Sequence, residues 1–262
     1  MITRPAVTGT SVAGGDVTLT IADGIGTIHF SHPKGNSLPG VLLRRLADAI
    51  TWMGKDPAAR VIVLRSEGSG PFCAGASFDE LVRIADAREG EEFFSGFSQV
   101  ILAMIRAPKL VLVRVHGRTA GGGVGIAAAG DYTFAVRGAE ARLSELAVGI
   151  GPFVVGPVIE HRIGKGPYAA MAVDTFWRDA DWCERHGLYA RVFDDGAEMD
   201  AAVNALAGTL AASNPEAMTA LKRVFWEGTS QWETLLADRA RTSGALVLSE
   251  YTRSAIAKFR AT

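Results

Sequence analysis

The sequence lacks several features that would place it in a specialised class of protein. Only two cysteines occur in 262 residues, Cys73 and Cys183, and they form no C-x-x-C pair. This usage excludes a disulfide framework and a cysteine-based metal site, and it fits a reducing compartment. No apolar run approaches the roughly 20 residues that span a bilayer. With a net charge of −1, no overall field attracts nucleic acid or an anionic membrane. We therefore expect a cytoplasmic protein without nucleic-acid or membrane partners.

The remaining composition is that of a globular protein with a substantial core. Hydrophobic residues make up 48% and charged residues 21% of the chain, which is ordinary for a folded domain. Residues 1–16 are rich in Gly, Thr, Ser and Ala and lack the apolar segment of a signal peptide. We expect these residues to form a loose N-terminal tail.

Hydrophobic patterning predicts alternating strands and helices. Residues 17–21 and 26–30 alternate around Asp23-Gly24, which predicts a β-hairpin. Apolar residues then recur at helical spacing between 42 and 53. Three short β-branched runs follow, at 61–64, 110–115 and 132–136, and are typical of buried strands. The order predicts an α/β fold.

The character of the chain changes near residue 195. Residues 196–262 are rich in Ala, Leu, Glu and Arg with helical periodicity, and Asn214-Pro215 is typical of a helix start. We therefore divide the chain into an α/β core, 1–195, and a helical C-terminal region, 196–262.

Two glycine-rich loops follow predicted strands. The first, 68–80, has small residues at 73–77 that let the backbone approach a ligand, although a simple tight turn would also explain them. The second, 116–126, contains Gly121-Gly122-Gly123 directly before an apolar helix. The free N–H groups of a helix N-terminus stabilise a nearby anion.

The second loop fits two kinds of chemistry. Residues 123–128 match G-x-G-x-x-A, the fingerprint of a dinucleotide-binding dehydrogenase, but the match lies mid-chain and no acidic-ended strand follows at the usual distance. The alternative is an oxyanion hole, which needs two N–H groups aimed at one point. One donor from each loop explains both loops, whereas the dinucleotide interpretation explains one.

The motifs together resemble those of the crotonase superfamily, the enoyl-CoA hydratases and isomerases. The resemblance covers about residues 17–195. It is carried by an ordered set of motifs: His32-Pro33-Lys34-Gly35-Asn36-Ser37-Leu38, Phe72-Cys73-Ala74-Gly75-Ala76, Gly121-Gly122-Gly123, Gly130-Asp131, Leu143-Ser144-Glu145-Leu146, Gly149-Ile150-Gly151-Pro152 and Arg162-Ile163-Gly164.

This resemblance implies a crotonase-like spiral of β-β-α turns and a C-terminal region that forms a homotrimer or a dimer of trimers. It also implies an acyl-CoA substrate and no separate cofactor, since coenzyme A is part of the substrate. The implied oxyanion donors are the N–H groups of Ala76 and Gly122, and Glu145 matches one of the family's two catalytic glutamates. The other positions that the resemblance places along the ligand are Lys34, Ala74, Ser77 and Phe78, with Pro152 and Phe153 beside the acyl group.

The sequence departs from the family pattern in four places. Gly125 stands where the other catalytic glutamate is expected, which weakens the case for ordinary two-carboxylate hydration. Ser77 replaces the usual Asp after Ala76, and Asp79 replaces a lysine often found near coenzyme A. Residues 153–155 are Phe-Val-Val instead of a Gly-rich stretch, which indicates a more apolar acyl pocket.

Glu145 is the candidate acid/base. It lies in the otherwise apolar run 143–150, where burial would raise the pKa of a carboxylate toward a useful value. An exposed or salt-bridged Glu145 is the structural alternative. Proton transfer beside a thioester gives an enolate, whose oxygen the N–H pair would stabilise.

We expect an enoyl-CoA hydratase-like lyase first. A double-bond isomerase is the second expectation, because one carboxylate can lift a proton and return it elsewhere. An inactive acyl-CoA binding protein is a third.

Four other residues admit a chemical role or a structural one. His116 fits an auxiliary acid or base, but a structural histidine is the preferred interpretation. Cys73 is interpreted as a small buried thiol rather than a nucleophile. Lys222 and Arg223 would either meet a coenzyme A phosphate or lie on a solvated helix face.

Overall fold

A computed structural model of the chain describes residues 15–260. The strands are β1 Asp16–Ala22, β2 Ile25–Ser31, β3 Val61–Ser66, β4 Val111–Val115, β5 Thr119–Ala120, β6 Tyr132–Val136, β7 Ala141–Arg142 and β8 Arg191–Phe193. The helices are α1 Gly40–Lys55, α2 Phe78–Leu81, α3 Ala87–Arg106, α4 Gly122–Ala129, the 3₁₀ turn η1 Leu146–Val148, α5 Gly156–Ile163, α6 Lys165–Asp174, α7 Ala180–Arg185, α8 Gly196–Ala212, α9 Pro215–Phe225, α10 Trp232–Leu246 and α11 Glu250–Arg260. Of the expected N-terminal tail, residues 1–14 lie outside the described residues, and Asp16 already belongs to β1.

The main sheet has six strands in the order β1-β2-β3-β4-β6-β8. The predicted hairpin is confirmed, since β1 and β2 pair antiparallel with Ala22 opposite Ile25. The other neighbours pair in parallel, so the carboxyl ends of β2, β3, β4 and β6 point to one edge. The short strands β5 and β7, which the patterning did not predict, form a separate parallel pair beyond that edge.

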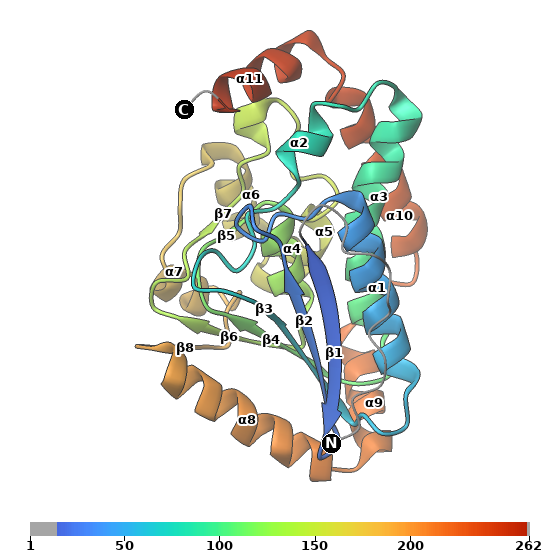
Figure 1. Cartoon of the computed structure of the whole chain (residues 1–262), viewed down its shortest axis with the longest axis vertical. Coiled ribbons are helices and arrows are strands. Elements are labelled where there is room, and N and C mark those ends of the chain that lie inside the picture. The colour runs from blue at the N-terminus through green and yellow to red at the C-terminus, as the bar shows by residue number, and fades with distance from the viewer. Residues whose placement is uncertain (1–14, 261–262) are drawn as a thin grey trace.

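Alternation along β3 divides the core in two. Ile62 and Leu64 belong to the larger core with the inner faces of α1 and α3, whereas Val61 and Val63 pack in a second core under α8. Successive strand residues point to opposite faces, so a fully apolar strand indicates a sheet covered on both sides. Figure 1 shows α1, α3 and α10 along one side of the molecule and α8 crossing the sheet at its lower end. None of the helices within residues 15–260 is long and apolar enough to cross a membrane.

The helices after residue 195 pack onto the rest of the chain. The predicted boundary coincides with the first residue of α8, Gly196, and α8 covers one face of the sheet. Helix α10 lies along α3, where a Cβ on Gly90 would come within 2.7 Å of the Gly244 backbone. Leu236 of α10 is fully buried, and Leu235 and Leu248 pack against the same core. Their own chain therefore covers Leu236 completely and Leu235 and Leu248 in part.

A buried ion pair joins α9 to the sheet. The Lys222 ammonium lies 2.8 Å from the Asp131 carboxylate at the start of β6, and both side chains are 3% exposed. Lys222 Nζ also donates hydrogen bonds to the carbonyls of Met104 and Lys109, and Trp226 Nε1 donates to Asp131. Lys222 therefore lies neither on a solvated face nor within reach of a ligand phosphate, contrary to both sequence interpretations.

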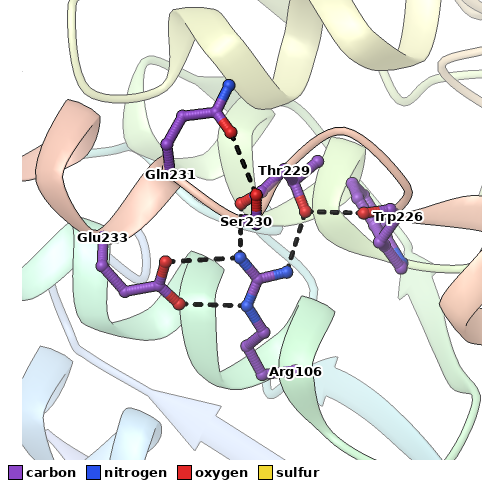
Figure 2. A network of polar contacts seen from close by, with 6 residues as sticks. All are labelled: Arg106, Trp226, Thr229, Ser230, Gln231 and Glu233. Carbon is purple, nitrogen blue, oxygen red and sulfur yellow. Dashed lines mark hydrogen bonds and ion pairs between the residues drawn. The ribbon is translucent and has the colours of Figure 1, made fainter.

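The turn between α9 and α10 is fixed by Arg106 at the end of α3. Figure 2 shows the Arg106 guanidinium between this turn and Glu233, whose two carboxylate oxygens face it. Arg106 Nη1 donates to the Thr229 hydroxyl at 2.8 Å, and that hydroxyl donates to the Trp226 carbonyl. The end of α3 thus holds the turn between α9 and α10 and the first turn of α10.

Replacing Lys222 tests how strongly this anchor stabilises the fold. Lys222→Met leaves the Asp131 carboxylate buried without its cation, which is expected to lower the free energy of unfolding by about 3–5 kcal/mol. Urea denaturation measures the change. Arg241→Met is the matched control, because Arg241 forms exposed ion pairs with Glu91 and Asp238 and should lose less than about 1 kcal/mol. Similar losses in the two variants would contradict the anchoring role.

Candidate active site

The two glycine-rich loops meet at the carboxyl edge of the sheet. They follow β3 and β4, which are parallel neighbours, so both loops leave the sheet at the same edge. Ala120 N donates a hydrogen bond of 2.9 Å to the Cys73 carbonyl, and Cys73 N donates to the Arg118 carbonyl. The segment at Leu38 joins from the other side, since Leu38 N donates to Gly75 and Ser77 N donates to Leu38. Backbone hydrogen bonds therefore hold three segments together.

Two glycines allow this close approach. Gly75 has φ +88°, and a Cβ there would lie 2.8 Å from the Ala120 carbonyl oxygen and 3.6 Å from Gly122 N. A Cβ on Gly122 would overlap the Phe97 ring, which comes from α3. A side chain at either position would push the two loops apart or displace α3.

The N–H groups of Ala76 and Gly122 have no acceptor among residues 15–260. Gly122 is the first residue of α4, a fully buried helix whose N-terminus carries partial positive charge. The preceding Gly121 N–H is already used by the Arg142 carbonyl. Two unused donors therefore lie on two loops in close contact, and an oxyanion hole requires a pair of donors of this kind.

A cavity lies in front of these donors. Its walls include seven of the nine predicted site residues: Ala74, Ala76, Phe78, Gly122, Glu145, Pro152 and Phe153. The other lining residues are Gly75, Leu81, Phe94, Phe97, Gly121, Ser144, Val148, Ile150, Gly151, Val154, Val155 and Ser243. Glu145 is the only ionisable side chain among these lining residues.

Glu145 places its carboxylate beside the second loop. It immediately precedes η1, and its Oε1 would lie 3.1 Å from a Cβ on Gly121. Its Oε2 is enclosed and has no hydrogen-bond partner in the described part of the chain, although the residue as a whole is half-buried. Burial raises the pKa of Glu145 to about 7, while the backbone N–H groups of Glu145 and Ser144 lower it by less. A carboxyl group with such a pKa exchanges protons readily near neutral pH.

Val155 occupies the space where a second carboxylate would enter. A Cβ on Gly125 would lie 2.6 Å from Val155 Cγ1, so α4 has no room for a side chain at this position.

The packing of α4 also explains the G-x-G-x-x-A match. Gly123 and Gly125 lie inside buried α4, where a Cβ on Gly123 would come within 2.8 Å of Cys73, so close packing rather than a phosphate-binding turn accounts for these glycines.

Lys34 and Ser77 are not among the residues lining the cavity. Lys34 is exposed and forms an ion pair with Asp79, the residue that stands where the family often has a lysine. Ser77 is 6% exposed and precedes α2. The Lys34–Asp79 pair therefore links the segment before α1 to the loop that carries Ala76.

Cys73 and His116, the two other residues near the loops with a possible chemical role, do not line the cavity. The Cys73 thiol is buried, which raises its pKa to about 12, and Cys73 therefore carries no nucleophilic thiolate at neutral pH. His116 is half-buried and does not line the cavity. Burial and the nearby Arg114 and Arg65 lower the pKa of His116, which favours the neutral ring. No cluster of three or more potential metal-ligating His, Cys, Asp or Glu side chains occurs in the described ranges.

Distant helices contribute residues to the cavity wall that the sequence patterns did not predict. Phe94 and Phe97 come from α3, and Ser243 comes from α10, about 120 residues after Gly122. Spacing of the Phe residues along α3 indicates an apolar face, but no local pattern says that this face meets a glycine-rich loop. Ser243 has no such signal at all.

Comparison with known proteins identifies the family. Residues 20–255 match the enoyl-CoA hydratase/isomerase family, and the chain belongs to it. The mitochondrial methylglutaconyl-CoA hydratase of Rattus norvegicus is 29% identical over 200 residues, which cover 74% of this chain and 62% of that protein. The crotonyl-CoA hydratase of Syntrophomonas wolfei subsp. wolfei is 28% identical over 64% of this chain and 65% of its own length. The matched segment thus spans less than two thirds of these relatives.

Solved structures show the same fold. An enoyl-CoA hydratase from Bacillus halodurans has a TM-score of 0.84 at 19% identity and covers 92% of this chain and 99% of its own. An enoyl-CoA hydratase from Mycobacterium avium subsp. paratuberculosis K-10 has a TM-score of 0.81 at 22% identity, with 94% and 95% covered. The predicted crotonase-like fold with a helical C-terminal region is therefore confirmed.

The raised pKa of Glu145 predicts a pH-dependent stability. The folded-state pKa of about 7 exceeds the ordinary value of 4.5, so the folded protein holds a proton that the unfolded chain releases between these pH values. The contribution of the Glu145 carboxyl group to the free energy of unfolding is fully present below pH 4.5 and is lost as the pH rises toward 7. Glu145→Gln, which is never charged, should exceed the wild type by about 3 kcal/mol at pH 8 and by less than about 0.5 kcal/mol at pH 4.5.

Urea denaturation of both proteins at the two pH values measures this difference. A pH-independent difference would mean that the Glu145 carboxylate is solvated.

Proposed function

We propose that the protein is an enoyl-CoA hydratase-like lyase that holds the thioester oxygen of an acyl-CoA substrate between the N–H groups of Ala76 and Gly122. The observation that carries this proposal is the Glu145 carboxylate, whose enclosed Oε2 has no hydrogen-bond partner among the described residues, in a cavity that two unused N–H donors also line. Membership of the enoyl-CoA hydratase/isomerase family supports the substrate class. Coenzyme A enters as part of the substrate, and no separate cofactor takes part.

In the proposed reaction Glu145 moves the protons. The carboxylate accepts a proton from water as that water attacks the β-carbon of the enoyl group, and the electrons shift toward the thioester oxygen. The two N–H groups stabilise the resulting enolate, and one such donor is worth about 3 kcal/mol. Glu145 then returns its proton to the α-carbon, so one carboxyl group serves both steps.

The absence of a side chain at Gly125 supports double-bond isomerisation as the second candidate. With Val155 filling the position of a second carboxylate, Glu145 is the only lining side chain able to exchange protons at neutral pH. Isomerisation needs only one such group, because the proton leaves one carbon and returns to another. Hydration adds the mass of one water, whereas isomerisation leaves the mass unchanged, so mass spectrometry with a panel of acyl-CoA esters separates the two.

An inactive binding protein is less consistent with Glu145. A purely binding cavity gains nothing from an enclosed carboxylate whose ionisation is unfavourable by about 3 kcal/mol.

The other side chains around the cavity are mostly apolar, including Phe94, Phe97 and Phe153. We therefore propose that the acyl group is uncharged and apolar.

The central kinetic prediction concerns Glu145. Glu145→Gln keeps the size of the side chain but removes the base, so kcat should fall by roughly 10²–10⁴-fold. Acyl-CoA binding should change little, because both N–H donors and the apolar walls remain. In the wild type kcat/KM should rise with pH through an apparent pKa of about 7, since the base acts only when deprotonated. Steady-state kinetics from pH 5 to pH 9, with calorimetric binding of a saturated acyl-CoA, measure these quantities.

Glu198→Gln is the control, because Glu198 is exposed on α8 and should retain wild-type kinetics. Wild-type turnover by Glu145→Gln would exclude the proposed base.

We further propose that the protein is a cytoplasmic homotrimer or dimer of trimers. Support comes from α9, whose Leu221, Val224 and Phe225 side chains are 48%, 58% and 42% exposed. A second exposed apolar group is formed by Val173 of α6 and Phe176, two residues after the end of that helix. Two exposed apolar patches on separate elements fit a head-to-tail ring.

The assembly is tested by placing a charge in the first patch. Val224→Glu should convert the oligomer to monomers, because a carboxylate cannot be buried unpaired in the interface. Light scattering coupled to gel filtration measures the mass, and Glu198→Gln again serves as the control. A wild-type protein of 27.7 kDa in solution would contradict the proposal.

A further inference from the structure

The catalytic turn around Glu145 is closed by Gly149. The Glu145 carbonyl accepts hydrogen bonds from Val148 N at 3.2 Å and Ile150 N at 3.0 Å, and Gly149 N donates to the Leu146 carbonyl. Gly149 ends η1 with φ +83°, a conformation that favours glycine. The position of the Glu145 backbone, and with it the origin of the side chain, therefore depends on this turn.

Helix α11 covers Gly149 directly. A Cβ on Gly149 would lie 2.6 Å from the Tyr251 ring and 2.7 Å from Thr252 Oγ1. The Thr252 hydroxyl donates a hydrogen bond of 3.1 Å to the Gly149 carbonyl. Figure 1 shows α11 at the end of the molecule where α2 lies, opposite α8. The last helix of the chain thus contacts the turn that carries the base.

The direction of the Thr252 hydroxyl is fixed by Ser249. Thr252 N donates to Ser249 Oγ, and the Ser249 hydroxyl donates to Thr252 Oγ1 at 3.0 Å. Because Thr252 Oγ1 already accepts this bond, its own proton points to the Gly149 carbonyl. Thr252 is completely buried, so no water can replace the contact. Ile256, also buried, docks the same helix into the main core.

We propose that Thr252 is a positioning residue for Glu145, acting through the Gly149 carbonyl. The inference rests on the proposed role of Glu145 as the base. Loss of the Thr252 bond frees the turn, so the carboxylate leaves its productive geometry more often and water reaches it more easily. Small displacements of a reacting group lower rates severalfold or more. A base that gains hydration also has its pKa lowered toward the ordinary value.

Thr252→Val tests this role, because valine keeps the shape of threonine and replaces the hydroxyl with a methyl group that cannot form the hydrogen bond. We expect kcat to fall about tenfold with KM changed less than twofold, because the Gly149 carbonyl loses the hydrogen bond that holds the turn. The acid limb of the kcat/KM profile should move to lower pH. Thr252→Ser restores a hydroxyl and should recover most of the rate.

A matched threonine on α10 controls for the substitution itself. The Thr242 hydroxyl is exposed and bonds to the Asp238 carbonyl in its own helix. Thr242→Val should therefore leave kcat, KM and the pH profile unchanged. If Thr252→Val is folded and has the wild-type pH profile and kcat, or if Thr242→Val reproduces its effect, the positioning role is wrong.

Hydrogen exchange provides a readout that does not need turnover. The amides of Val148 and Ile150 should exchange several-fold faster in Thr252→Val than in the wild type, and at wild-type rates in Thr252→Ser and Thr242→Val. Unchanged exchange in Thr252→Val overturns the inference. If the wild type turns over none of the acyl-CoA esters, the proposed function fails on its own, and the exchange rates still decide whether Thr252 holds the turn.

Discussion

The proposed chemistry depends on one close contact between two backbones, at Gly75 and Ala120. Parallel pairing of β3 and β4 delivers both loops to the same edge, but only the missing Cβ at Gly75 lets the first loop approach within van der Waals distance of the second. Gly122 is then covered by Phe97 from the other side. The proposed pair of N–H donors on separate loops depends on this packing, which explains why small residues cluster in both loops.

The candidate site lowers the stability of the fold. An enclosed carboxylate with a pKa of about 7 is unfavourable to fold at neutral pH, and the surrounding helices must offset that cost. The C-terminal region contributes directly, since Ser243 lines the cavity and Thr252 contacts the turn after Glu145. The buried Lys222–Asp131 pair and the Arg106 contacts hold this region in place. The helices after residue 195 therefore complete the cavity as well as the core.

Local patterns predicted the hairpin, the three buried strands and both loops, because alternation, β-branched runs and glycine clusters act over a few residues. They also indicated Glu145, since a lone carboxylate in an apolar run is conspicuous. Contacts between segments far apart in the chain produce no recognisable pattern in the sequence. Lys222 looks like an ordinary surface lysine on an amphipathic helix, yet it is buried against Asp131 about 90 residues earlier. Val155 beside Gly125, and Thr252 beside Gly149, are likewise visible only once the chain is folded.

The pairing of Gly125 with Val155 constrains what chemistry the site can acquire. The Cβ of a glutamate at position 125 would lie 2.6 Å from Val155 Cγ1, which is too close for two carbon atoms. Gly125→Glu alone would therefore displace α4 or α5. Because α4 also presents the Gly122 N–H, such a displacement would move one of the two proposed oxyanion donors. A two-carboxylate site would therefore require a smaller residue at 155 together with the glutamate at 125. In the proposed mechanism every proton transfer therefore passes through Glu145, the only ionisable side chain among the residues that line the cavity.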